Sequence, residues 1–114
     1  MGCNVNVKEE GGVSVVELSG RIALGDGSGV VRDAVKGLLA RNRTKILLDL
    51  SGVNYIDSTA LGELVGSYAT VTQSGGQIKL AGAQKRVHDL LLITKLYTVF
   101  EAFNDRAEAV KSFG

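Results

Sequence analysis

The sequence contains no proline, and its 114 residues include only one cysteine and one histidine. A single cysteine cannot form an internal disulfide, and it has no second cysteine with which to bind a metal, so a reducing compartment fits. Without proline, glycine is the residue that most strongly marks turns and the ends of helices and strands in this chain. These shortages argue against a disulfide-stapled scaffold and against a cysteine metal site.

The chain also lacks an excess of either charge and any long apolar run. Thirteen Lys and Arg residues nearly balance twelve Asp and Glu residues, which leaves a formal net charge of +1. This balance offers no electrostatic footprint for a phosphate backbone, so direct binding to DNA or RNA is not expected. No apolar stretch comes near the roughly 20 residues needed to cross a bilayer. We therefore expect a soluble, cytoplasmic protein whose partners include neither nucleic acid nor membrane.

What the sequence does contain is the composition of an ordinary globular protein, with 45% hydrophobic and 22% charged residues. A chain of 114 residues can bury one core and leaves no room for a second. Neither a linker, nor an internal repeat, nor a low-complexity stretch interrupts it. We expect a single domain over residues 1–114.

The first half of the chain predicts a β-hairpin, a helix and a buried strand. Apolar residues alternate with polar ones on both sides of a turn at residues 10–12, which is typical of two antiparallel strands. Helical spacing over residues 31–39 predicts an amphipathic helix after a glycine-rich loop at residues 25–29. The nearly continuous apolar run at residues 45–50, followed by turn-forming residues 51–52, predicts a parallel strand buried on both faces.

The second half predicts three helices that alternate with two strands. In chain order these are a helix from about 58 to 73, a strand at 77–81, a short helix around 87–91, a strand at 98–100 and a terminal helix after 104. Asn104 or Asp105 can cap the terminal helix, whose inward face carries Ala107, Val110 and Phe113. Together the elements predict an α/β fold, in which a mixed sheet of four to five strands packs with about four helices.

No segment has the spacing of a catalytic, phosphate-binding or metal site. Ser58 lies between residues 56 and 60 without the flanking glycines of a nucleophile elbow, and His88 is more simply a partly exposed surface residue than a general base. The loop at residues 25–29 lacks both the Lys-Ser/Thr ending of a P-loop and a G-x-G-x-x-G spacing. Neither a Cys/His cluster nor a calcium-type carboxylate series is present. We expect no enzyme activity, no cofactor and no metal.

Three polar residues in a row, Asp57, Ser58 and Thr59, stand where the long helix of residues 58–73 begins. Any of them can be the N-cap, which is the simpler explanation of their presence and requires no further role. The same position also suits a phosphoserine, because the helix dipole and the free N–H groups stabilise a dianion. Residue type alone leaves both explanations open.

The exposed side of the same helix carries a row of small residues. Gly62, Gly66 and Ala69 or Thr70 follow one another at spacings of three or four, which places them in one row. Each glycine inside a helix costs about 1 kcal/mol relative to alanine, so a compensating reason is needed. Close packing of another chain and close packing of a neighbouring element of the same chain are equal alternatives.

Two adjoining segments, LDLSGV at residues 48–53 and YIDSTALG at residues 55–62, resemble the signature of STAS domains of the anti-sigma factor antagonist type. The segments SGGQIKLA at residues 74–81 and KRVHDLL at residues 85–91 are similar to the next strand and the following helix of that family. The resemblance covers almost the whole chain. It implies the STAS fold for the α/β domain expected above.

The resemblance further implies a non-enzymatic partner switch. Unphosphorylated members of this family bind an anti-sigma factor that has a histidine-kinase-like ATPase fold, and a sigma factor is released. The anti-sigma factor phosphorylates the serine that directly follows the motif's aspartate, which is Ser58 here with Thr59 as the fallback acceptor. A PP2C-type phosphatase restores the serine, so ATP and metal belong to the partners.

The residues that the resemblance assigns to partner binding are Asp26, Asp57, Ser58, Thr59, Leu61, Gly62 and Gly66. The chain departs from the family in two places: Asp26 lies later than the usual aspartate after the second strand, and Ala60 stands where glycine is usual. These departures leave room for a second function, a STAS scaffold subunit of a lipid or anion transport assembly or of a multi-STAS stress-sensing complex. The intact pair of Asp57 and Ser58 favours the phosphorylation switch.

Overall fold

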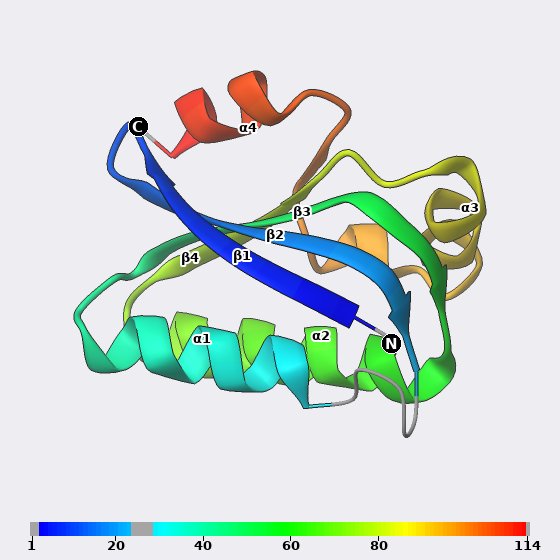
Figure 1. Ribbon diagram of the computed structural model, residues 1–114, viewed down its shortest axis with the longest axis horizontal. Coiled ribbons are helices and arrows are strands. Elements are labelled where there is room, and N and C mark those ends of the chain that lie inside the picture. The colour runs from blue at the N-terminus through cyan, green and yellow to red at the C-terminus, as the bar shows by residue number, and fades with distance from the viewer. Residues whose placement is uncertain (1–2, 24–28, 114) are drawn as a thin grey trace.

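A mixed five-stranded sheet forms the centre of the computed structural model, which describes residues 3–23 and 29–113 (Figure 1). Its strands are β1 (Cys3–Glu10), β2 (Val13–Ile22), β3 (Lys45–Ile56), β4 (Gln77–Ala81) and β5 (Ala102–Phe103), in this order across the sheet. β1 runs antiparallel to β2, and every later neighbour is parallel. The sheet confirms the predicted α/β class, with an N-terminal hairpin followed by parallel β–α units.

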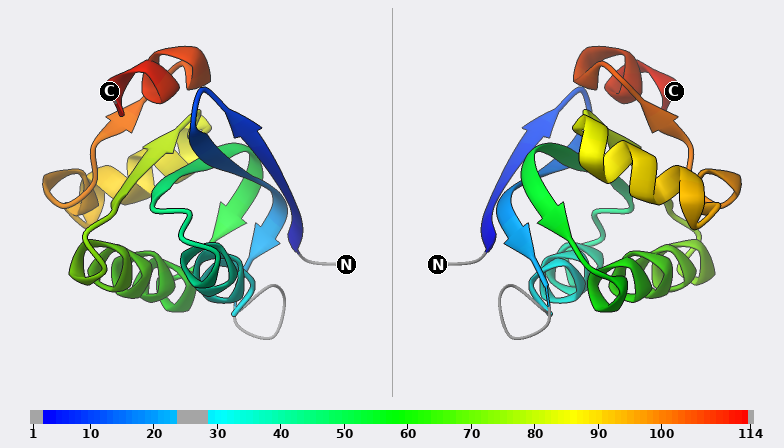
Figure 2. Two further views of the ribbon diagram at one scale, coloured as in Figure 1. Left: turned by 90° about the vertical axis from the view of Figure 1, so that its left-hand side faces the viewer. Right: turned by 90° about the vertical axis from the view of Figure 1, so that its right-hand side faces the viewer.

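Helices cover both faces of this sheet. Those in the described residues are α1 (Val30–Ala40), α2 (Ser58–Gln73), α3 (Lys85–Ile93), the short 3₁₀ helix η1 (Leu96–Thr98) and α4 (Arg106–Ser112). α1 and α2 lie side by side on one face, whereas α4 lies on the other (Figure 2). No helix in the described part of the chain combines the length and the apolarity that crossing a membrane requires.

The core is divided between the two faces of the sheet. Alternate side chains of β3 point in opposite directions, so Ile46 and Leu48 pack against α1 and α2, while Leu47 packs beneath α4. All three side chains have no exposed surface. Burial on both faces is what the apolar run of this strand predicted.

The prediction of a turn at residues 51–52 is wrong, because β3 continues through Ser51 and Gly52 to Ile56. Gly52 pairs with Ser19 of β2 beside a register shift, and a Cβ atom at Gly52 would lie 2.7 Å from the Cβ atom of Ser19. Glycine is needed here for the close approach of two strands, and not for a change of direction. The longer strand carries the chain to the start of α2.

The last strand is also displaced from its predicted position at residues 98–100. That segment ends η1 and forms a turn, from which Phe100 reaches the core with 2% of its surface exposed. The strand that forms is β5, where Ala102 and Phe103 pair with Leu80 and Ala81. The prediction is wrong because an apolar residue can be buried from a turn as well as from a strand.

Asp105 is the N-cap of α4, since its carboxylate accepts a hydrogen bond from the N–H of Ala107 at 3.2 Å. This confirms one of the two predicted caps. The inward face predicted for α4 is correct for Phe113, which is 5% exposed. It is wrong for Ala107, which is exposed, because Ala109 occupies the buried position instead.

Candidate functional site

The candidate site lies where β3 ends and α2 begins. β3 ends at Ile56 and α2 starts at Ser58, so one residue, Asp57, separates the strand from the helix. The N–H of Asp57 donates to the carbonyl oxygen of Ile22 at 3.2 Å, which ties this junction to the end of β2. The carboxyl ends of parallel strands are where open α/β sheets gather ligand and partner sites.

Asp57 is the N-cap of α2. Its backbone is extended, with φ at −108°, and its carboxylate accepts a hydrogen bond from the N–H of Ala60 at 2.9 Å. Such a cap stabilises a helix by about 1 kcal/mol. Of the three polar residues that could have capped this helix, the first one does so.

Ser58 and Thr59 are therefore exposed residues of the first turn, and neither of them is the cap. Backbone N–H groups of a first turn lack intrahelical acceptors, and they form the positive end of the helix dipole. α2 is 16 residues long and has no acidic residue in its first turn. The hydroxyl of Ser58 thus stands where a helix stabilises an added anion.

A hollow of about 430 Å³ adjoins Ser58 on the side of α3. The end of β3 lines one side of it, and Arg86, Leu90 and Ile93 of α3 line the other. Ile93 is 76% exposed. The sequence reasoning missed this surface. Four consecutive apolar residues at positions 90–93 were a signal for it, because a helix cannot bury four residues in a row on one face.

The positively charged side chain of Arg21 packs on the ring of Tyr55 beside the same junction. The guanidinium carbon of Arg21 lies 4.4 Å from the centroid of the Tyr55 ring, in the geometry of a cation–π contact. The two residues are partners in the ladder between β2 and β3. Their contact joins the ends of β2 and β3 next to the start of α2.

The row of small residues on α2 faces outward. Gly62 and Gly66 are both exposed, and a Cβ atom at either position would have nothing within 4 Å beyond the neighbouring backbone of α2 itself. Packing against a described element of the same chain therefore does not account for these glycines.

Two of the residues assigned to partner binding need separate mention. Leu61 is 6% exposed and belongs to the core beneath α2, so its side chain offers a partner almost no surface. Helix periodicity explains this, because Leu61 shares the inward face with Leu64. Asp26 lies outside the described residues.

The lone histidine is placed away from Ser58. Its Nδ1 atom lies 2.6 Å from the hydroxyl of Tyr97, and it lines a different hollow, next to β4 and β5. Burial, and to a lesser degree Asp89, raises the pKa of Tyr97. Within residues 3–23 and 29–113, no three His, Cys, Asp or Glu side chains gather as metal ligands. His88 is therefore not positioned as a general base for Ser58.

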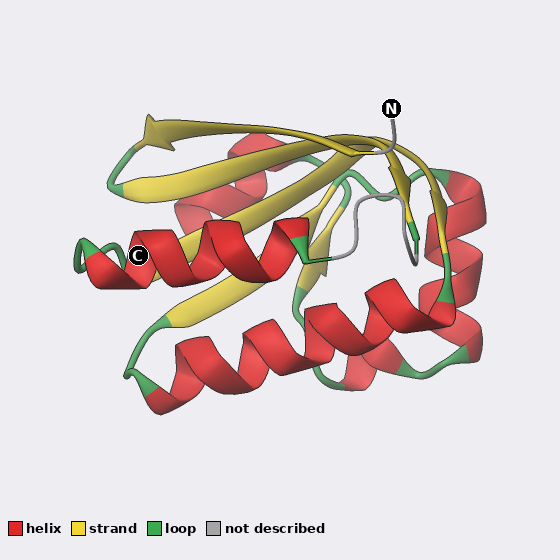
Figure 3. Cartoon of the chain, turned by 60° about the horizontal axis from the view of Figure 1, so that its bottom comes forward, coloured by secondary structure: helices red, strands yellow, loops and turns green. Residues whose placement is uncertain are grey.

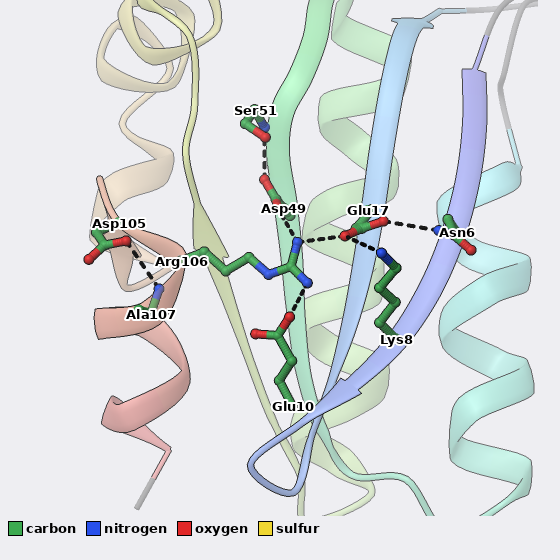
Figure 4. Close-up of polar contacts among 9 residues, drawn as sticks. All are labelled: Asn6, Lys8, Glu10, Glu17, Asp49, Ser51, Asp105, Arg106 and Ala107. Atoms are coloured by element: carbon green, nitrogen blue, oxygen red, sulfur yellow. Dashed lines mark hydrogen bonds and ion pairs between the residues drawn. The ribbon is translucent and has the colours of Figure 1, made fainter.

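A second polar cluster joins α4 to the sheet (Figure 4). Arg106 donates to Glu17 at 2.6 Å and to Asp49 at 3.1 Å, and it also pairs with Glu10. The hydrogen bond from Arg106 lowers the pKa of Glu17, while the bonds to Glu10 and Glu17 raise the pKa of Arg106. Each carboxylate comes from a different strand, so the cluster anchors the last helix across β1, β2 and β3.

A mixed sheet whose buried strand leads directly into a capped helix is the arrangement of the STAS domain. The sequence model of the STAS domain family matches residues 4–109 of this chain. An anti-sigma-B factor antagonist of Bacillus subtilis is 32% identical over 101 residues, which are 89% of this chain and 91% of the relative. This chain belongs to the STAS domain family, among the anti-sigma factor antagonists.

Solved structures agree on the fold. An anti-sigma factor antagonist from Mycobacterium paratuberculosis superposes with a TM-score of 0.86 at 22% identity, over 97% of this chain and 93% of that one. The Bacillus cell fate determinant SpoIIAA in its phosphorylated form gives a TM-score of 0.72 at 14% identity, over 96% of this chain and 98% of that one. At these identities the likeness concerns the fold alone, and it confirms the predicted STAS fold.

Proposed function

We propose that this chain is an anti-sigma factor antagonist that binds its partner while Ser58 is unmodified and releases it when Ser58 is phosphorylated. The observation that carries the proposal is the division of roles at the start of α2. Asp57 provides the cap, which leaves the exposed hydroxyl of Ser58 without that structural task. The simpler explanation of this serine, that it only caps the helix, is thereby removed.

The proposed partner is an anti-sigma factor with a histidine-kinase-like ATPase fold, which also acts as the kinase of Ser58. A PP2C-type phosphatase reverses the modification. Both partners follow from the family resemblance, and the name of the Bacillus subtilis relative supports the antagonist role. ATP and metal come with the partners, and the chain is a substrate and binding module without catalysis of its own.

The switch acts through local charge and bulk. A phosphate adds about two negative charges beside the carboxylate of Asp57, on a surface that the partner has to approach. The N-terminus of α2 tolerates the anion, so the helix does not need to unfold. A partner surface that complements the unmodified serine is then repelled, while the rest of the domain keeps its structure.

The proposed contact surface consists of Asp57, Ser58, Thr59, Gly62 and Gly66, with Asp26 as a contact outside the described residues. Thr59 is also exposed and is the fallback acceptor for the phosphate. The antagonists among the relatives favour this function over a scaffold role in a transport or stress-sensing assembly.

A pull-down from a lysate of the source organism tests the proposal, with captured proteins identified by mass spectrometry. We expect the parent chain and Ser58→Ala to capture an ATPase-fold anti-sigma factor, and Ser58→Asp to lose it. Ser74→Asp is the matched control, because it places the same charge at the other end of the same helix. Equal capture by the parent chain, Ser58→Ala and Ser58→Asp would contradict the switch.

A further inference from the structure

A groove of about 430 Å³ lies between α1 and α2, the two helices that run side by side in Figure 3. Its lining on α2 extends from Thr59 to Thr70, which is about 16 Å along a helix that rises 1.5 Å per residue. Thr59 at one end of the groove directly follows Ser58, whose side chain lines the other hollow, on the α3 side of the same helix turn. The groove and the surface that the phosphate would change therefore meet at the first turn of α2, on different sides of the helix.

Glycines form part of the floor of this groove. Gly62 and Gly66 both line it, and a Cβ atom at either would have nothing within 4 Å beyond the neighbouring backbone of α2. Glycine is disfavoured in the interior of a helix relative to alanine, and the described fold gains no packing from it here. The absence of these two side chains instead allows a foreign backbone to approach α2 closely.

The floor also contains buried polar atoms that lack partners in the described structure. Ser67 is 3% exposed, and its hydroxyl makes no hydrogen bond to any described residue. One carboxylate oxygen of Glu63 accepts the N–H of Gly29 at 2.5 Å, whereas the other is buried without a described partner. Polar atoms in such a position are normally hydrogen-bonded, so the floor is suited to a donor from outside.

The α1 side of the groove is cationic. Arg32 and Lys36 line it and are four residues apart, so they project from the same side of the helix. The ion pair of Arg32 with Asp33 is loose, at 3.7 Å, with side chains that are 59% and 77% exposed. Lys36 forms no ion pair with a described residue. This side is therefore suited to carboxylates from outside.

We propose that a helix of the partner protein docks in this groove, an inference that rests on the proposed function and specifies its contact. The helix lays a narrow face on Gly62 and Gly66, directs a carboxylate at Arg32 and Lys36, and directs a hydrogen-bond donor at Glu63 and Ser67. A helix fits because small residues four apart on α2 form a shallow row along which a second helix can pack. A phosphate on Ser58 lies one residue from Thr59 at the end of the groove, where its negative charge repels the carboxylate-bearing helix.

The test measures the affinity of the purified ATPase-fold anti-sigma factor, captured by Ser58→Ala, for groove variants of the chain. Gly66→Leu fills the groove, and we expect its affinity to fall at least about tenfold while its melting temperature is no lower than that of the parent chain. Gly37→Leu is the matched control, because Gly37 is an exposed glycine of α1 outside the groove, and its Cβ position is equally open. Its affinity should stay within about twofold of the parent value.

A charge variant gives a second measurement that does not depend on filling the groove. Lys36→Glu should weaken binding, and the loss should shrink at high salt, because exposed charges are screened. Lys111→Glu, on the exposed side of α4, makes the same charge change away from the groove and should leave the affinity unchanged.

The outcomes separate this inference from the switch itself. If Gly66→Leu and Lys36→Glu bind like the parent chain while Ser58→Asp does not, the groove is not the docking site and the switch stands. If the groove variants weaken binding and Ser58→Asp does not, the docking site stands and the switch fails. If the parent chain sediments as a dimer and the Gly66→Leu variant as a monomer, the groove binds a second copy of this chain and the proposed partner helix is wrong. Failure to capture any ATPase-fold anti-sigma factor would overturn both proposals.

Discussion

Two adjacent side chains at the start of α2 have different tasks, and their separation is the basis of the proposed switch. The carboxylate of Asp57 is bound to the N–H of Ala60, so this residue is part of the folded helix. The side chain of Ser58 is exposed one position later. A modification at Ser58 therefore changes the surface without removing the cap.

This separation predicts different costs for two neighbouring alanine substitutions. Asp57→Ala should lower the free energy of unfolding by about 1 kcal/mol, because the cap is lost. Ser58→Ala should change it by less than about 0.5 kcal/mol, as expected for an exposed residue without a structural partner. Urea unfolding of both variants measures the difference. Equal costs would mean that the serine shares the capping role.

Residue types alone could locate the site but could not assign its parts. Asp57, Ser58 and Thr59 are all competent caps, and their order along the chain does not reveal which one has the extended backbone. The end of β3 decides this, because the N–H of Asp57 bonds to Ile22 of the neighbouring strand. That contact joins residues far apart in sequence, so local reasoning could not find it.

At the scale of elements, α4 is held on the sheet by one arginine that serves three strands. Arg106 pairs with carboxylates from β1, β2 and β3, of which Asp49 is the most buried, at 7% exposed. Without Arg106, Asp49 keeps only the N–H of Ser51 as a described hydrogen-bond partner. The anchor of the last helix thus depends on a single side chain.

Arg106→Met should lower the free energy of unfolding at pH 7 by about 2 kcal/mol, because it leaves a buried carboxylate without its cation. The arginine holds the pKa of Glu17 below its ordinary value of 4.5, so the stability from this contact is present above that value and is lost as pH falls through the lowered pKa. The part of the difference that comes from Glu17 should therefore be full above about pH 5 and shrink below it. Urea midpoints at several pH values measure it.

The control for this variant is Lys111→Met, which removes a cation from the exposed side of the same helix. We expect it to change the free energy of unfolding by less than about 0.5 kcal/mol at every pH at which Arg106→Met is measured. A pH profile of Arg106→Met that stays parallel to that of the parent chain would show that Arg106 does not couple to the titration of Glu17.

Glycine substitutions distinguish a close contact from an open position. Gly52→Ala should destabilise the domain by about 1–3 kcal/mol, because its Cβ atom would lie 2.7 Å from Ser19 and force β2 and β3 apart. Gly37→Ala should stabilise it by up to about 1 kcal/mol, because α1 gains helix propensity at an open position. Thermal unfolding compares the two. A neutral Gly52→Ala would contradict the close approach of the strands.

Most elements could be predicted because their periodicity is long and strong. The helix of residues 58–73 was correct at both ends, since a polar cluster precedes it and two glycines follow it. The errors fall where burial does not follow the expected pattern, as at Gly52, which lies inside a strand, and at Phe100, which is buried from a turn. In both cases a contact with a distant segment overrides the local signal.

For the whole molecule, one phosphate changes the formal net charge from +1 to about −1, because it adds about two negative charges. A net charge as small as this does not steer a charged partner toward the protein over long distances. The effect has to be local, at the junction of β3 and α2. The proposed switch is therefore a change of one surface on a domain that stays folded.

Two variants of equal net charge test whether position matters more than total charge. Ser58→Asp places the charge at the N-terminus of α2 and should leave the melting temperature unchanged or slightly higher, whereas Ser74→Asp places it at the C-terminal end and should lower it slightly. Each shift corresponds to about 0.5 kcal/mol. Calorimetry measures both, and an unfolded Ser58→Asp would contradict a switch that preserves the fold.

The most direct measurement is to incubate the purified chain with the captured ATPase-fold anti-sigma factor and Mg-ATP, locate any phosphate by mass spectrometry, and compare the affinity before and after. We expect a single phosphate on Ser58, an affinity at least about a hundredfold lower, and no phosphate on Ser58→Ala. Phosphate on a residue other than Ser58 or its fallback Thr59, or an affinity that is unchanged by phosphate on Ser58, would contradict the account.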